Sequence, residues 1–210
     1  MKKSLIFSVL CGMCLFAHAA IYTPQTVINP KTYGQEYYVS NADGILSPAV
    51  VENINQLCRS LNQETKVELA VVAIDGYDET QYDDYNFAIN LFNYWGIGDK
   101  KRNNGILVFL APDVYTIRIL TGSGIDNILT DDICGDILSN NMSYIRIGNY
   151  NEGMTHIVSD IVRFCMQGGI KKELTKPLLS DYSSIILICV VLILCVGIGV
   201  LIFMKKKSIS

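Results

Sequence analysis

Residues 67–74 read Val-Glu-Leu-Ala-Val-Val-Ala-Ile, a nearly continuous apolar run rich in β-branched side chains. Such a run is typical of a strand that is covered on both faces of a sheet. Helical patterns lie on either side of it. Ser47 and Pro48 are an N-cap and a first helical residue for a helix that extends to about Asn62. A second helix is expected from about Asp83 to Tyr94. A covered strand between two helices indicates an α/β fold.

The chain continues with two short apolar runs that are close enough to pair as a hairpin, and then with two helical patterns. These elements are expected at residues 106–110, 115–121, 130–142 and 151–166. Their order predicts a small mixed β-sheet sandwiched by helices, within a domain of residues 38–168. Residues 20–37 show no steady period and are expected to form an extended segment that leads into this domain.

The first residues have the pattern of a signal peptide. Lys2 and Lys3 precede a short apolar run, which ends at Ala17-His18-Ala19. This order of charge, apolar core and small residues predicts a signal peptide over residues 1–19, with cleavage after Ala19. An uncleaved anchor is the alternative, but the run is shorter than the roughly 20 residues that a membrane span needs.

The other end of the chain predicts a single transmembrane helix. Residues 185–204 contain no charged side chain, and Lys205, Lys206 and Lys207 follow at once. Lysines beside a span favour the cytoplasmic side, so residues 205–210 are expected in the cytoplasm. The domain and its linker, residues 169–184, are then expected outside it. The predicted location is the inner or plasma membrane, as a single-pass protein.

The charge is uneven along the chain. Removing the five terminal lysines leaves an exported part with 12 basic and 20 acidic residues, a formal charge of −8. This charge excludes nucleic acid as an expected partner, because phosphates select basic surfaces. It favours solvation, cation binding or basic partners.

The numbers and positions of the cysteines and histidines limit which disulfides and metal sites the domain can contain. Three cysteines, Cys58, Cys134 and Cys165, lie within the domain, so at most one disulfide could form. Each lies in an apolar helical context, which favours buried free thiols over a bridge. His156 is the one histidine left after cleavage, and its helical neighbours are polar, which predicts a solvated side chain. A zinc site with several histidines from one chain is thereby excluded.

Acidic residues are the strongest candidates for a ligand site. Five aspartates fall in loops or at helix starts near the expected strand ends, namely Asp43, Asp75, Asp126, Asp131 and Asp132. Ligands of α/β sheets gather at such positions, and carboxylate oxygens suit Ca²⁺ or Mg²⁺. Ordinary helix capping and turn formation are the alternative explanation for the same residues.

Three segments together resemble the TPM domain family, which is known from plant thylakoid-lumen proteins and many membrane-anchored bacterial envelope proteins. The first segment is Tyr-Val-Ser-Asn-Ala-Asp-Gly-Ile-Leu-Ser at residues 38–47. The second is Trp-Gly-Ile-Gly at 95–98 with Asn-Gly-Ile-Leu at 104–107. The third runs from Arg118 through Gly-Ser-Gly-Ile-Asp at 122–126 to Leu-Thr-Asp at 129–131. The resemblance covers about residues 36–168.

The resemblance implies an α/β sandwich between a signal peptide and a membrane anchor. Relatives include acid phosphatases, proteins that bind divalent cations such as calcium, and proteins linked to the assembly or repair of membrane protein complexes. The family's acidic site would fall on Asp43, Asp126 and Asp131. Its other motif residues would be Trp95, Gly96, Gly98, Asn104, Gly105, Gly122 and Gly124. Asn41 and Asp126 stand where relatives usually have aspartate and glutamate, which should weaken cation binding.

Two functions follow from these observations. The favoured one is a membrane-tethered binding or accessory role in the assembly or maintenance of membrane protein complexes, with membrane or envelope proteins as partners and with Ca²⁺ or Mg²⁺ as a possible regulator. The alternative is a metal-dependent acid phosphatase, with Asp43 and Asp131 as candidates for catalysis. Trp95 is expected to be a structural plug and not a contact surface.

Overall fold

The computed structural model describes residues 22–167. The predicted signal peptide, the linker at 169–184, the transmembrane segment at 185–204 and the tail at 205–210 lie outside the described residues. Between Tyr22 and Gln167, no helix is both long and apolar enough to cross a membrane.

A small mixed sheet forms the middle of the domain. Its strands are β1 (Val39–Ser40), β2 (Glu68–Ala73), β3 (Gly105–Ala111) and β4 (Thr116–Thr121), in the spatial order β1-β2-β3-β4. β1, β2 and β3 are parallel, and β4 pairs with β3 in the antiparallel direction. The sequence-based prediction of a hairpin is thus confirmed, and β1 and β4 are the two edges of the sheet.

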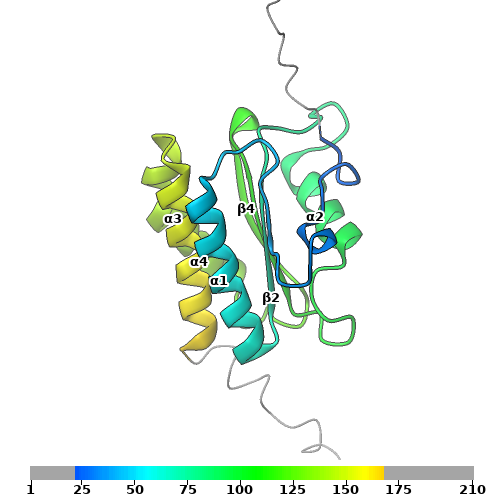
Figure 1. Cartoon of the computed structure of the whole chain (residues 1–210), viewed down its shortest axis with the longest axis vertical. Coiled ribbons are helices and arrows are strands. Elements are labelled where there is room, and N and C mark those ends of the chain that lie inside the picture. Colours follow the sequence, from blue (N-terminus) through cyan, green and yellow to red (C-terminus); the bar gives the residue numbers. More distant parts are fainter. Residues whose placement is uncertain (1–21, 168–210) are drawn as a thin grey trace, which may run out of the picture.

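Helices cover both faces of this sheet (Figure 1). Three of them, α1 (Pro48–Thr65), α3 (Asp131–Arg146) and α4 (Tyr150–Met166), lie on one face. α2 (Asp84–Trp95) lies on the other, beside the N-terminal segment and its short 3-10 helix η1 (Pro30–Thr32). A second short helix, η2 (Pro112–Val114), joins β3 to β4. The predicted helix sandwich is therefore present in the domain.

Side-chain caps fix where the helices begin. The Ser47 hydroxyl accepts a hydrogen bond from Val50 N, the Asp83 carboxylate accepts one from Asn86 N, and the Thr130 hydroxyl accepts one from Ile133 N. Each cap satisfies a backbone amide that has no partner within its own helix. The predicted starts at Pro48 and after Thr130 therefore agree with the structure.

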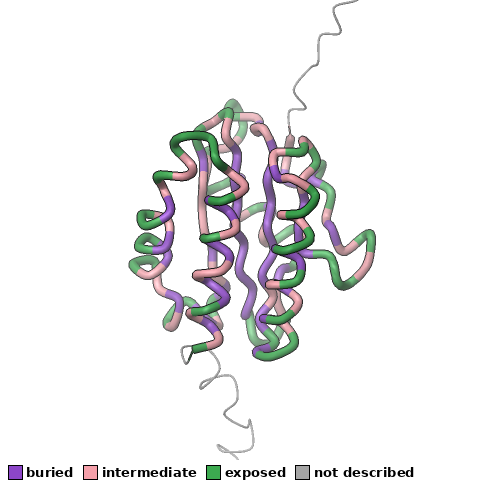
Figure 2. Tube along the Cα trace, turned by 60° about the vertical axis from the view of Figure 1, so that its left-hand side comes forward, coloured by how far each residue is buried: buried purple, intermediate pink, exposed green. Residues whose placement is uncertain are grey.

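The core has two parts, one on each face of the sheet. Figure 2 shows that the buried positions run along the strands and the inner sides of the helices. Leu69 and Val71 of β2 belong to the cluster under α1, α3 and α4, whereas Ala70 and Val72 belong to the cluster under α2. Alternate residues of β2 thus enter different clusters. The continuous apolar run at 67–74 reflects burial on both faces, as predicted.

The N-terminal segment is more structured than its sequence predicts. Val27 is buried in the cluster under α2, and Tyr22 forms a parallel bridge with Tyr77. β1 was not predicted as a strand because it is only two residues long. A period of two cannot be recognised over such a length.

The three cysteines of the domain are buried free thiols, as predicted. Burial raises the pKa of the Cys134 thiol to about 11 and that of Cys165 to about 12. These thiols are protonated at neutral pH, so they pack as apolar groups and are poor nucleophiles.

Candidate functional site

The glycines of the predicted motif meet at the start of β3, where they allow the backbone to pack closely. A Cβ atom on Gly122 would lie 2.1 Å from the carbonyl oxygen of Asn103, and one on Gly105 would lie 2.3 Å from that of Ile97. The corresponding contact at Gly124 would be 1.6 Å. No real side chain tolerates such distances. These glycines are therefore required for the close approach of two loops, which explains the motif without a ligand.

Asn104 ties the same junction together. It is fully buried, its Nδ2 donates to the Lys66 carbonyl at 2.7 Å, and its Oδ1 accepts from Asp99 N at 2.9 Å. Its backbone carbonyl also accepts a hydrogen bond from Glu68 N. The side chain thus has protein partners for both of its polar atoms, so its position in the motif is structural.

Trp95 and the glycines after it close α2. Gly96 ends the helix with a φ of 63°, and Gly98 has a φ of 97°, both in the left-handed region that favours glycine. The Trp95 ring packs against the apolar cluster under α2. Its buried Nε1 has no hydrogen-bond partner among the described residues. Trp95 therefore fills space between α2 and the sheet, as expected for a plug.

Three aspartates lie where the parallel strands end, at what we call the carboxyl edge of the sheet. Asp43 follows β1, Asp75 follows β2 and Asp113 follows β3. The Asp43 carboxylate accepts a hydrogen bond from the Tyr22 hydroxyl at 2.9 Å and another from Asp75 N at 2.8 Å. Asp113 N donates to the Asp75 carbonyl at 2.8 Å. Backbone contacts thus hold the three carboxylates in one region.

The carboxylates of this region repel one another. Burial raises the pKa of the Asp75 carboxyl, and the charges of Asp43 and Asp113 raise it further. Burial, together with the hydrogen bond to Asp43, raises the pKa of Tyr22 to about 12. In the part of the chain that the structure describes, no lysine or arginine forms an ion pair with these aspartates. The carboxyl edge therefore favours cations over anions.

Asp126 and Asp131 lie at the opposite end of the sheet, which we call the amino edge. Because β4 is antiparallel, its last residues lie beside the first residues of β3, and Gly122 N donates to the Gly105 carbonyl there. Asp126 and Asp131 line one shallow hollow of about 430 Å³ together with Asn127, Thr130 and Asp132. The fold brings these two predicted ligands together and separates both from Asp43.

The three predicted metal ligands therefore do not form one coordination set. Between residues 22 and 167, no group of three or more histidine, cysteine, aspartate or glutamate side chains is arranged to hold a metal ion. The physical reason is the direction of β4, which carries Asp126 away from the end of the sheet where Asp43 lies. Cation binding at either edge stays a prediction.

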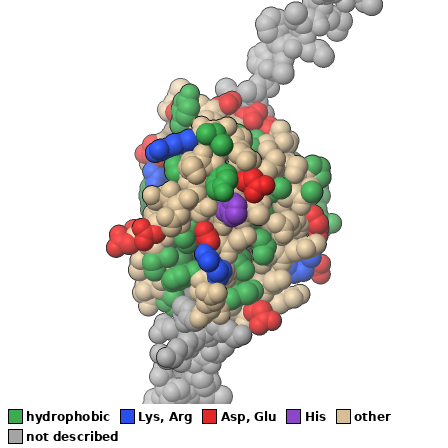
Figure 3. Space-filling model, turned by 90° about the vertical axis from the view of Figure 1, so that its left-hand side faces the viewer, with side chains coloured by type: hydrophobic (Ala, Val, Ile, Leu, Met, Phe, Trp, Pro, Cys, Tyr) green, Lys and Arg blue, Asp and Glu red, His purple; other side chains and the backbone are tan. Residues whose placement is uncertain are grey.

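His156 is solvent-exposed, as predicted. Its Nε2 lies 3.6 Å from a Glu152 carboxylate oxygen, and its ring stacks on Tyr144 with a centroid distance of 5.1 Å. Figure 3 views the outer face of the helix layer, where acidic, basic and apolar side chains are interspersed. This face therefore offers no extended surface of a single charge.

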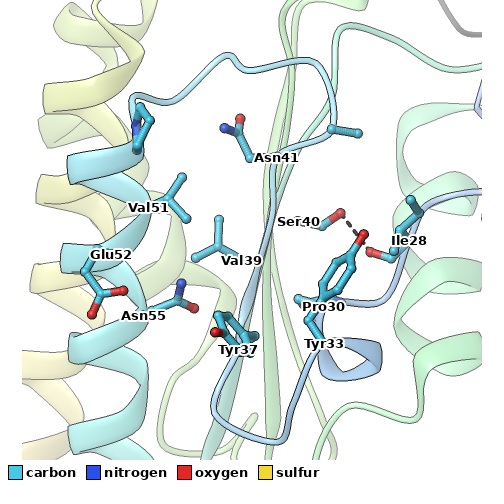
Figure 4. A pocket seen from close by; sticks show the side chains of 12 residues that line it. Ile28, Pro30, Tyr33, Tyr37, Val39, Ser40, Asn41, Val51, Glu52 and Asn55 are labelled. Carbon is cyan, nitrogen blue, oxygen red and sulfur yellow. Dashed lines mark hydrogen bonds between the residues drawn. The ribbon is translucent and has the colours of Figure 1, made fainter.

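A third feature is a hollow beside β1, between α1 and the N-terminal segment (Figure 4). Its volume is about 410 Å³, and Ile28, Tyr33 and Tyr37 on its rim are 48%, 69% and 46% exposed. At its base the Ser40 hydroxyl donates to the Ile28 carbonyl at 2.8 Å. We call this feature the β1 hollow. Large apolar side chains that stay exposed around a concavity are typical of contact surfaces for other proteins.

The TPM domain profile matches residues 39–164, which is more than half of the 210-residue chain. The chain belongs to the TPM domain family. No protein with a curated description matches it. The boundaries of the match enclose every strand and all four α-helices except the end of α4, so the family is defined by the same domain that the fold contains.

Two solved structures resemble this TPM domain. The N-terminal domain of a protein from P. gingivalis is 29% identical with a TM-score of 0.65, over 71% of this chain and 95% of that one. The BA42 protein from the psychrophilic bacterium Bizionia argentinensis is 18% identical with a TM-score of 0.50, over 66% of this chain and 94% of that one. The second likeness concerns the fold alone.

Two residues of the carboxyl edge were missed in the sequence of this TPM domain. Tyr22 lies in the aperiodic N-terminal segment, where nothing indicates that its hydroxyl reaches Asp43. Asp113 follows Pro112 in the connection between the two strands of the predicted hairpin and was not among the candidate aspartates. Its place after a third parallel strand was the signal that could have grouped it with Asp43 and Asp75.

Proposed function

We propose that this TPM domain protein is a membrane-tethered binding protein that acts outside the cytoplasm and contributes to the assembly or maintenance of membrane protein complexes. The observation that carries the proposal is the β1 hollow with its exposed Tyr33 and Tyr37. Tyrosine offers a large apolar contact area together with a hydroxyl, and it is enriched among the residues that dominate binding energy. A protein partner that inserts an apolar side chain between the two rings fits this hollow.

The predicted ends of the chain support the same role. A signal peptide at 1–19 exports the domain, and a span at 185–204 keeps it at the inner or plasma membrane. A tether restricts the search to partners in or near the same membrane, which raises their effective concentration. Weak docking is then sufficient, as is typical of an accessory protein.

Ca²⁺ or Mg²⁺ fits the proposal as a regulator at the amino edge. Asp126, Asp131 and Asp132 are exposed and, with Asn127 and Thr130, line a common hollow. Their side chains are not arranged as a ready coordination set, so they would have to converge on the cation when it binds. These hard oxygen donors have the chemistry that either cation prefers. At the carboxyl edge both oxygens of Asp43 already accept hydrogen bonds, so that carboxylate has less capacity for a cation. The amino edge is therefore our choice for the cation.

A metal-dependent acid phosphatase has less support. Its two candidate aspartates, Asp43 and Asp131, lie at opposite edges of the sheet and cannot act on one phosphate. Arg118, the one charged residue of β4, already forms an ion pair with Asp84 at 2.5 Å and is not free to bind a phosphate. Phosphoryl transfer depends on positive groups at the transferring oxygens. Hydrolysis of a phosphate monoester that disappears in Asp131→Ala would reverse this ranking.

The docking proposal can be tested by crosslinking in the cells that make the protein. A photoreactive amino acid is placed at Tyr33 or Tyr37 of the full chain, and as a control at Tyr94, which is also exposed but lies on α2 and does not line the β1 hollow. We expect discrete crosslinks to membrane proteins from positions 33 and 37 and none from 94. Equal crosslinking at all three positions, or none at any, would contradict docking at this hollow.

A further inference from the structure

The outer side of β4 is an open edge with unused hydrogen-bonding groups. Gly122 N donates to the Gly105 carbonyl at 2.9 Å, so the register turns the backbone groups of Leu120, Arg118 and Thr116 toward β3. The alternate residues Ile117, Ile119 and Thr121 must turn their amide and carbonyl groups away from β3. Among the described residues, these outward amide and carbonyl groups form no backbone hydrogen bond.

A groove runs along this edge between α2 and α3, and we call it the β4 groove. One hollow of about 560 Å³ is lined by Tyr85 and Ile89 of α2, Ile119 of β4, and Gly135 and Leu138 of α3. A second hollow of about 630 Å³ continues it toward the start of β4, and both are lined by Ile117 and Arg118. The open backbone of β4 thus lies at the base of a groove whose walls carry apolar side chains together with charged ones, among them Asp126, Asp131 and Arg146.

The two edges of the sheet differ in how they are protected. Native sheets block an edge by making it short or by placing proline, a bulge or a charged side chain on it. β1 is two residues long, whereas β4 has six residues and no proline. The one charge of β4, on Arg118, is held against Asp84 on α2. The β4 edge therefore lacks the usual barriers to pairing with another strand.

We propose that the β4 groove binds an extended, basic polypeptide segment of a partner protein by strand addition. The backbone of the segment would pair with Ile117, Ile119 and Thr121 as a fifth strand, and its side chains would alternate between the α2 and α3 walls. This site lies at the other edge of the sheet from the β1 hollow, so the inference stands independently of the docking proposed there.

The charge at one end of the groove favours a basic residue in the segment. Asp126 and Asp131 line one end of it, are exposed, and form no ion pair with a described lysine or arginine. A lysine or arginine at the matching end of the segment would neutralise them. Arg118 is paired with Asp84, and Arg146 lines the other end of the groove, so the selection for a basic residue acts at the Asp126 and Asp131 end. A single extended segment fits between the two helices, whereas a second copy would bring its own α2 and α3 along the same edge. A partner segment is therefore favoured over self-pairing.

The test uses the full chain in detergent micelles and a fluorescent octapeptide that alternates valine and threonine between two terminal lysines. Anisotropy measures binding, and hydrogen exchange measures protection at residues 116–121. We expect binding with protection of the amides of Ile117, Ile119 and Thr121. N-methylation of one alternate set of peptide amides should weaken binding at least tenfold, and methylation of the other set should be tolerated. That asymmetry is the signature of pairing along one edge.

Two variants of α3 distinguish specific binding in the β4 groove from nonspecific binding of the peptide to the protein. An added Cβ at Gly135 meets nothing within 4 Å, and Gly135 lines the groove. Gly135→Phe should therefore place a ring in the groove and weaken peptide binding at least tenfold, while Gly135→Ala should not. Replacing the lysines of the peptide with glutamates should also abolish binding. The proposal is overturned if both methylated peptides bind as well as the parent, or if the parent does not bind up to about 1 mM. If the protection of the β4 amides from hydrogen exchange increases with protein concentration in the absence of peptide, the edge pairs with a second copy of the chain. That result would overturn the proposal of a partner segment.

Discussion

The hydroxyl of Tyr22 donates a 2.9 Å hydrogen bond to Oδ1 of Asp43, across 21 residues of sequence. This contact fastens the start of the described chain to the turn after β1. Hydrogen bonds to charged acceptors contribute more than neutral ones. The hydroxyl of Tyr22 thus helps to hold the N-terminal segment in place on the sheet.

Replacing Tyr22 with phenylalanine should test that dependence. Tyr22→Phe removes the donor and leaves Oδ1 of Asp43 without its partner, so we expect a loss of about 1–2 kcal/mol in the free energy of unfolding. Urea unfolding followed by the fluorescence of Trp95, the one tryptophan of the chain, measures it. Tyr85→Phe is the matched control, because that exposed hydroxyl has no recorded partner, and its stability should not change. Equal losses in both variants would refute the role of the contact.

Asp75 should make the stability depend on pH. Burial and the charges of Asp43 and Asp113 raise its pKa above the ordinary 3.8. The folded state therefore holds this proton more tightly than the unfolded state, and the stabilisation is complete below pH 3.8 and lost as pH rises through the raised pKa. We expect Asp75→Asn to be more stable than the parent at pH 7, with the difference disappearing in acid.

Urea midpoints of both proteins between pH 3 and 7 would measure this effect. Asp136→Asn provides the control, because Asp136 is exposed on α3 and has no recorded ion pair or hydrogen bond from its side chain. Its stability difference from the parent should stay flat over the same range. A flat difference for Asp75→Asn as well would show that the carboxyl edge creates no repulsion.

Glycine at position 122 should be irreplaceable for steric reasons. Gly122→Ala would place a Cβ 2.1 Å from a backbone oxygen, so the two loops must separate, at a cost of about 2–3 kcal/mol. Gly135→Ala, in an exposed helix position with open space, should instead stabilise the protein by about 0.5–1 kcal/mol. Urea unfolding of the two variants compares them directly. Similar stabilities would mean that the junction can relax around a methyl group.

Cation binding should follow the geometry of the two edges. In calorimetric titrations with Ca²⁺ and Mg²⁺, we expect Asp126→Ala and Asp131→Ala to lose the binding that the parent shows. Asp43→Ala should retain it within about twofold, since a carboxylate at the opposite edge contributes little through solvent. Loss in Asp43→Ala alone would move the cation to the carboxyl edge. No heat with the parent protein would remove the cation from the proposed function.

The helices and strands of the domain were predicted from the sequence more accurately than the positions of the candidate site residues relative to one another. The helix starts at Pro48 and after Thr130, the strand at 67–74 and the hairpin all follow from caps and apolar periods, which are local signals. β1 was not predicted because a strand of two residues shows no alternation of apolar and polar side chains. The separation of Asp43 from Asp126 was not predicted either. The predicted hairpin implied it, because an antiparallel strand brings its last residue back to the amino edge.

The candidate site was harder to predict for a related reason. The family glycines and Asn104 form the most specific pattern in the sequence, yet the contacts of Gly122 and Asn104 are internal to the protein. Tyr22 and Asp113, which surround Asp43 and Asp75, give no comparable pattern. Close packing constrains residue type strongly, whereas an exposed hollow such as that beside β1 can be lined by many side chains.

The two ends of the described chain lie at opposite ends of the sheet. Tyr22 contacts the carboxyl edge, and α4, which begins beside Ser47 at that edge, runs in the same direction as α1 and ends with Met166 at the amino edge. If the predicted span at 185–204 anchors the chain, the amino edge with Asp126 and Asp131 would be the end of the domain nearer the membrane, and Asp43 would lie at the far end. Acidic headgroups would then repel these aspartates, so the predicted tether would hold the domain close to a surface from which its own charge separates it.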